Sequence, residues 1–164
     1  MRGDTGSYRR NNCLVGKFGE AGASIMLGGE MACDVWATGS RRGLQFDPDI
    51  TTVKGPFSSY NIHVKTCHMK HGRLIDGTTL LPSASASWTI DASDPVMLCP
   101  SSSDIIVLMF ANEQGDVFGL GWVYALDVAC LWKPCRSPYM RHKRAIYFPD
   151  IKWGTRWFPY HPSL

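Results

Sequence analysis

The residues best suited to hold a metal ion lie in one short segment, residues 63–71, with the sequence HVKTCHMKH. Cys67 and His71 are four residues apart, and Cys130 and Cys135 are five apart. These four side chains could supply the nitrogen and sulfur ligands of a tetrahedral zinc ion. In a strand, however, only alternate side chains share a face, and no CxxC pair supports the site. Surface histidines and core thiols are the alternative, so the metal stays unassigned.

A nucleophilic site is the second chemistry to consider, because the chain has six cysteines and five histidines. A Cys–His pair would make the protein a small hydrolase. No cysteine lies in a polar, helix-starting context that would lower the pKa of its thiol, and Cys33, Cys99 and Cys130 lie in apolar runs. The metalloprotease, phosphate-loop and nucleophile-elbow motifs are missing. We therefore expect no enzyme, no catalytic residue and no cofactor.

Two pairs of acidic residues lie in segments predicted as loops. They are Asp47 with Asp49, and Asp91 with Asp94. Carboxylate oxygens could bind calcium at an interface between subunits. Loop aspartates also cap turns and face water, and we expect this second role.

The strongest charge asymmetry lies at the C-terminal end, in residues 136–164. This segment has six basic residues and one acidic residue, a net charge of +5, whereas the whole chain carries +3. Basic groups neutralise phosphates and aromatic rings stack on unpaired bases, so the segment suits single-stranded nucleic acid. Its aromatic residues would alternatively pack on the body or on a neighbouring subunit. The predicted contact residues are Arg136, Arg141, Lys143, Arg144, Lys152, Trp153, Arg156 and Trp157.

Length and composition limit what can position these residues. A chain of 164 residues fits one domain, and 45% apolar content with a charge of only +3 excludes a disordered protein. The longest apolar run, residues 117–132, is too short for a membrane span. No apolar stretch of signal-peptide type is found near the N-terminus.

Strand patterns dominate the chain. The glycines of residues 13–31 disfavour a helix and predict short strands at Leu14–Phe18 and Ala23–Leu27. Residues 57–67 alternate in polarity, Asp76-Gly77 predicts a hairpin, and residues 104–112 and 117–132 predict a second hairpin. Glycines 119 and 121 predict a bulge in it.

About eight short strands without a long helix predict an all-β fold, an antiparallel β-sandwich or barrel. Residues 1–12 would form a polar N-terminal arm and residues 13–135 the β-sandwich domain. Residues 136–164, which contain prolines that favour extended chain, would form a basic and aromatic C-terminal arm.

Three stretches resemble the jelly-roll coat proteins of small icosahedral positive-strand RNA viruses, of the tombusvirus and sobemovirus kind. They are Phe57–Val64 (FSSYNIHV), the segment from Asp94-Pro95 to DIIVLM, and the segment that starts with GWVYALDV at Gly121 and runs to Pro134. The family's basic N-terminal arm has no counterpart here, and its interface calcium sites match no residues that we can name.

The resemblance implies a structural subunit of a viral capsid or a similar large assembly. The partners would be other subunits of a homo- or hetero-oligomer, with RNA as a further partner, and the location would be the virion or the host cytoplasm. The alternative function is that of a β-barrel protein that binds single-stranded nucleic acid, and the small Cys–His hydrolase is the third.

Overall fold

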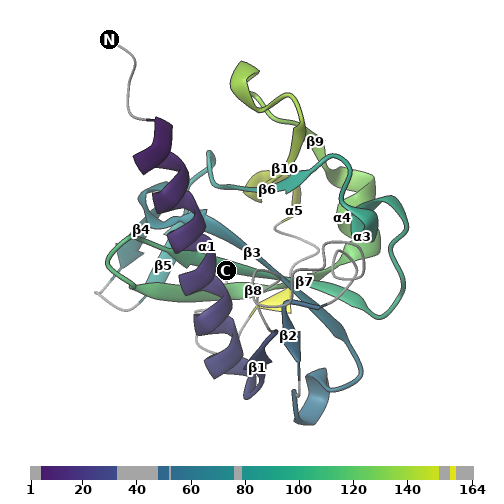
Figure 1. The fold of residues 1–164 in the computed structure, drawn as a ribbon. Helices are drawn as coiled ribbons and strands as arrows, with labels where there is room; N and C mark the ends of the chain where they lie inside the picture. The colour runs from purple at the N-terminus through teal and green to yellow at the C-terminus, as the bar shows by residue number, and fades with distance from the viewer. Residues whose placement is uncertain (1–4, 33–47, 52, 76–78, 152–155, 158–164) are drawn as a thin grey trace.

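The fold is built on one mixed β-sheet that carries a helix on one face and a smaller sheet with short helices on the other (Figure 1). The computed structural model describes residues 5–32, 48–51, 53–75, 79–151 and 156–157. The six strands of the main sheet are, in spatial order, β1 (Glu30–Met31), β2 (Ile50–Thr51), β3 (Asn61–His68), β7 (Asp104–Ala111), β8 (Val117–Tyr124) and β11 (Arg156–Trp157).

The centre of this sheet combines two kinds of pairing. Strands β3 and β7 run parallel, with Asn61 opposite Asp104, whereas β7 and β8 form an antiparallel hairpin. The register of that hairpin shifts between Leu108 and Met109, which face Gly121 and Gly119. The predicted hairpin and its bulge at the two glycines are therefore confirmed up to Tyr124. The rest of the predicted second strand is wrong, because Ala125–Leu131 form a helix, α4.

Helix α1 (Thr5–Leu27) crosses one face of the main sheet and contacts β3, β7 and β8 (Figure 1). Its buried residues recur every three or four positions, as expected for one helix face. They are Val15, Gly19, Gly22, Ala23, Ser24 and Leu27. The predicted strands at Leu14–Phe18 and Ala23–Leu27 are therefore wrong, and residues 5–12 of the predicted arm belong to this helix.

Close packing explains why glycines lie within this helix. A Cβ atom at Gly19 would overlap the side chain of Thr66 on β3, and one at Gly22 would lie 2.8 Å from a methyl group of Val117 on β8. Each glycine in a helix costs about 1 kcal/mol relative to alanine. Here the close approach of α1 to the sheet requires glycine, so the packing outweighs the local preference.

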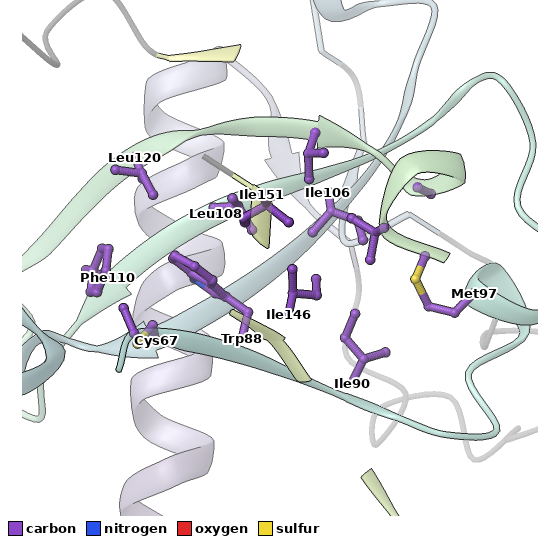
Figure 2. Packing of buried hydrophobic residues seen from close by; sticks show 14 of the residues in the cluster. Cys67, Trp88, Ile90, Met97, Ile106, Leu108, Phe110, Leu120, Ile146 and Ile151 are labelled. Atoms are coloured by element: carbon purple, nitrogen blue, oxygen red, sulfur yellow. The ribbon is translucent and has the colours of Figure 1, made fainter. Parts of the chain in front are cut away.

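The second layer consists of a three-stranded sheet and three short helices. The sheet has the order β6 (Ser87–Asp91), β10 (Lys143–Tyr147) and β9 (Lys133–Pro134). The helices are α3 (Pro95–Leu98), α4 (Ala125–Leu131) and α5 (Phe148–Ile151). Figure 2 shows large side chains filling the space between this layer and the main sheet, among them Trp88, Phe110 and Ile146. The Trp88 indole N–H donates to the carbonyl of Met109, beside the bulge.

A long connection links the two parallel strands. It contains a 3-10 turn, η2 (Met69–His71), and the antiparallel pair β4 (Gly72–Ile75) and β5 (Thr79–Pro82), followed by β6 and α3. The β4–β5 pair confirms the predicted hairpin, although Asp76-Gly77 itself lies outside the described residues. Further 3-10 turns are η1 (Gly55–Phe57) and η3 (Pro138–Met140).

The predicted fold class needs correction. Most elements are strands, in mixed and antiparallel sheets that do not close into a barrel, but α1 and the parallel β3–β7 pair do not fit an all-β antiparallel fold. Residues 143–151 of the predicted C-terminal arm form β10 and α5, in which Ala145, Ile146 and Ile151 are buried. None of the helices in the described ranges is long and apolar enough to cross a membrane.

Candidate nucleic-acid interface

Strands β9 and β10 form an antiparallel hairpin in which Pro134 pairs with Arg144 and Lys133 with Ala145. The turn η3 lies between the two strands, and the main chain of Met140 donates to the carbonyl of Ser137 to close it. In Figure 1 the yellow-green turn segment extends away from the main sheet, beyond β9 and β10. We call residues 133–144 the basic hairpin.

All the charged residues of the basic hairpin are positive. It contains five lysines and arginines, and no acidic residue occurs between Asp127 and Asp150. Its exposed residues include Arg136, Tyr139, Arg141 and His142. Tyr139 is the most exposed large apolar residue described, with 91% of its surface accessible. The five basic residues are Lys133, Arg136, Arg141, Lys143 and Arg144.

Two of the arginines lie over aromatic rings. The guanidinium carbon of Arg136 is 4.5 Å from the centre of the Tyr147 ring, and that of Arg144 is 5.3 Å from the Trp132 ring. The main-chain N–H of Arg136 also donates to the Tyr147 hydroxyl, at 3.1 Å. A cation over a ring face is stabilised by about 0.5–1 kcal/mol at exposed sites, so the rings help to hold both guanidinium groups in place. A ring face accepts no N–H donor in the guanidinium plane, so these donors remain available for a ligand.

Nearby carboxylates neutralise only part of this charge. Lys133 pairs with Asp150 at 2.9 Å, and Lys143 lies 3.9 Å from Asp91. Within the described ranges, the ion pairs include none of the three arginines of the hairpin. The arginines therefore present positive charge that is not balanced by a neighbouring carboxylate.

The predicted contact residues separate into three groups. Arg136, Arg141, Lys143 and Arg144 come together in the basic hairpin. Arg156 and Trp157 form β11 at the edge of the main sheet, where they pair with Trp122 and Gly121 of β8. Lys152 and Trp153 lie outside the described residues. The sequence prediction missed Lys133, because it began the basic segment three residues later and did not expect a strand pair there.

Residues 63–71, which the sequence suggested as a metal site, do not form one in the part of the chain that the structure describes. There, no group of three or more histidine, cysteine or acidic residues is placed to hold a metal ion. His68 pairs with Glu113 of the β7–β8 turn, at 3.0 Å. The hydrogen bond from the main-chain N–H of Glu113 to its own carboxylate, and then the one from this histidine, lower the pKa of Glu113. His68 is therefore used to join the end of β3 to that turn.

The thiols do not form a nucleophilic pair with histidine rings among the described residues. Cys67 is only 3% exposed, and burial raises the pKa of its thiol to about 11. Burial also raises the pKa of Cys135. A high pKa keeps a thiol protonated and a poor nucleophile at neutral pH. Cys13, Cys99 and Cys130 are exposed, and Cys33 lies outside the described residues.

The acidic loop pairs have structural roles where they are described. Asp49 accepts a hydrogen bond from the main-chain N–H of Val64 at 2.7 Å, just beyond the single pairing of β2 with β3 at Ile62. Asp94 accepts from the N–H of Val96 and caps α3. Asp47 lies outside the described residues. The contacts of Asp49 and Asp94 agree with the capping role predicted for loop aspartates, whereas Asp91 is the last residue of strand β6 and not a loop residue.

One buried polar pair joins the starts of the two parallel strands. His63 is 6% exposed, and its Nε2 lies 3.5 Å from Asp104 Oδ1, although no group in the described part donates to or accepts from this nitrogen. Asp104 accepts from the main chain of Ser101 and from the side chain of Asn61. Burial raises the pKa of Asp104, but these hydrogen bonds outweigh it, so that its pKa falls below 3.8.

Two stretches that carry the coat-protein resemblance meet in an aromatic cluster. Phe57 contacts Trp122 edge to face, with ring centres 5.8 Å apart, and Tyr60 lies 5.9 Å from the same ring. The hydroxyl groups of Tyr60 and Tyr124 are 3.3 Å apart. These half-buried rings pack beside the core that α1 covers, so their role in this chain is to join β8 to the segment before β3.

Comparison with known proteins found no family model, no curated protein and no solved structure that matches this chain. The resemblance to viral coat proteins therefore stays a prediction from the sequence. The candidate interface is assigned on its own charge and geometry.

Proposed function

We propose that this protein binds nucleic acid through the basic hairpin. The observation that carries the proposal is an exposed β-hairpin with five basic residues, no acidic residue and three arginines without a carboxylate partner in the described ranges. Phosphates of nucleic acid supply regularly spaced negative charge, and their binding by lysine and arginine releases counterions. The guanidinium group suits this role because its planar donors bind phosphate in pairs.

The attachment of the hairpin to the core supports the same function. The buried residues Ala145 and Ile146 anchor β10 in the second layer, and Lys133 and Lys143 contact carboxylates at its base. Arg136 lies on the Tyr147 ring. Less conformational entropy is lost when a phosphate binds to side chains that are already ordered. A basic surface whose side chains are ordered in this way is better suited to bind nucleic acid than a group of charges that only contacts water.

The test is the salt dependence of binding, measured by fluorescence anisotropy with a labelled 20-nucleotide RNA. We compare the wild type with Arg141→Gln, in the hairpin, and with the matched control Arg73→Gln, an exposed arginine on β4. The slope of log K against log salt is negative, and the loss of one phosphate contact makes it less steep by about one. We expect this for Arg141→Gln only. Equal slopes for all three proteins, or no binding at low salt, would contradict the proposal.

A second candidate function, the assembly subunit predicted from the sequence, is favoured by a different surface. Leu98 on α3 and Leu126 on α4 are 65% and 45% exposed, and these two helices pack against each other. A second copy of this chain would remove these apolar side chains from water. Sedimentation velocity at increasing concentration tests this, with Leu98→Ser as the variant. A wild type that stays monomeric would exclude this candidate without affecting nucleic-acid binding.

A further inference from the structure

We infer that the basic hairpin binds single-stranded nucleic acid, with Tyr139 stacking on an unpaired base, an inference that rests on the proposed function. Tyr139 lies in the turn η3, and 91% of its surface is exposed. Arginine and histidine side chains flank it in the sequence. They are Arg136 on one side and Arg141 and His142 on the other. The hairpin thus presents one free aromatic ring between positive charges.

Tyr147, at the end of β10 and beyond the basic hairpin, shows that exposure of such a ring is not general here. Tyr147 is 8% exposed, accepts a hydrogen bond from Arg136 and lies under its guanidinium group. No ring contact or hydrogen bond of Tyr139 is found within the described ranges. Tyr147 therefore holds the hairpin together, whereas Tyr139 contributes nothing visible to the packing of the described residues.

The turn presents this ring in a defined position. Pro138 occupies the first residue of η3, and its ring fixes one main-chain dihedral. The hydrogen bond from the N–H of Met140 to the carbonyl of Ser137, at 3.1 Å, closes the turn around Tyr139. A main chain that is already ordered loses little conformational entropy when the side chain binds.

The combination of ring and charge distinguishes single strands from duplexes. Stacking of a base on an aromatic side chain contributes about 1–3 kcal/mol, and it tolerates any base because every base has a flat face. In a duplex, both faces of an internal base are already stacked, and the arginines alone would contact its phosphates. The expected ligand is therefore RNA or DNA with at least one accessible unpaired base.

The experiment compares three proteins on two probes over a series of salt concentrations. The proteins are the wild type, Tyr139→Ala and the matched control Tyr139→Phe, which keeps the ring. The probes are a labelled 12-nucleotide oligouridine and a labelled blunt 12-base-pair RNA duplex. Because Tyr139 is almost fully exposed, both variants should keep the wild-type thermal unfolding curve.

We expect Tyr139→Ala to weaken oligouridine binding by about 5-fold or more, the equivalent of at least 1 kcal/mol of stacking. Duplex binding should be unchanged, the salt dependence should keep its slope, and Tyr139→Phe should bind oligouridine like the wild type. Equal affinities of wild type and Tyr139→Ala for oligouridine would overturn the inference, as would an equal loss on both probes. If the wild type binds neither probe, the proposed function itself fails.

Discussion

The two ends of strand β10 differ in almost every physical property, although they are adjacent in the sequence. Ala145 and Ile146 are buried, and Ile146, which pairs with Trp88 of β6, belongs to the core between the two layers. Lys143 and Arg144 are partly exposed and belong to the basic hairpin. The same strand is thus a core element at one end and the support of a charged surface at the other. Stability and binding should therefore respond to different substitutions.

For the buried end of β10, the largest expected loss of stability comes from substitution of Trp88. This side chain is fully buried, lies 5.5 Å from the Phe110 ring and donates to the Met109 carbonyl. We expect Trp88→Ala to lower the free energy of unfolding by about 3–5 kcal/mol, because it leaves a cavity and an unpaired carbonyl. Urea denaturation measures this. Thr89→Ala, on the other face of the same strand, is the control, and a loss for Trp88→Ala no greater than for the control would contradict the prediction.

On the opposite face of the main sheet, the packing of α1 depends on small residues rather than on large ones. We expect Gly19→Ala to lower the free energy of unfolding by about 1–3 kcal/mol, because its new methyl group overlaps Thr66. Gly16→Ala is the matched control in the same helix, since no atom lies within 4 Å of the added Cβ. This control should gain up to about 1 kcal/mol from helix propensity. Thermal or urea unfolding that ranks the two variants in the reverse order would contradict the close packing of α1.

The buried pair at the start of the parallel strands gives stability a pH dependence. The pKa of Asp104 is lower in the folded protein than its ordinary value of 3.8. Its contribution is therefore fully present above pH 3.8 and is lost as the pH falls through the lower, folded value. Asp104→Asn should lower the free energy of unfolding by about 1.5–3 kcal/mol at pH 7, the range for a hydrogen bond to a charged group.

At pH 3 the same substitution should cost less than at pH 7. Urea unfolding of wild type and Asp104→Asn at the two pH values measures the difference, and Asp127→Asn, at an exposed position on α4, serves as the control. A cost for Asp104→Asn that is the same at both pH values would mean that the charge of this carboxylate does not stabilise the fold.

The hairpin end of the comparison should contribute least to stability. Arg141 is exposed, and in the described part of the chain it takes no part in an ion pair or a ring contact. Arg141→Gln should change the free energy of unfolding by less than about 0.5 kcal/mol. Measurement of both the free energy of unfolding and the RNA affinity of this variant tests whether stability and binding depend on different ends of β10. A large loss of stability would show that the hairpin is part of the folding core.

The parts of the fold that the sequence predicted well are those with a local signal. The alternating residues of β3, the continuous apolar run of β7 and the glycines of β8 each specify a strand or a bulge through neighbouring residues. Helix α1 could not be predicted in this way. Its glycines oppose a helix locally and make sense only against Thr66 and Val117, which are distant in the sequence.

The candidate site was predicted in part for a similar reason. Charge counting along the chain identified the arginines of the basic hairpin, because they lie close together in the sequence. The contacts that hold the hairpin in place could not be predicted by counting charges. The contacts of Arg136 with Tyr147, and of Lys143 with Asp91, depend on strand pairing between β10, β9 and β6. The prolines of this segment predicted extended chain but not the partner strands.

The parallel pairing of β3 with β7 has a consequence for how the protein reaches its native state. Residues 61–68 can pair with residues 104–111 only after the whole connection between them is available. Contacts between segments far apart in the sequence slow folding, because the loop must close before the contacts form. During synthesis, the edge of β3 that pairs with β7 therefore has no native partner until residues 104–111 have left the ribosome. An unpaired strand edge is a template for aggregation, so this edge is a liability while the chain is being made.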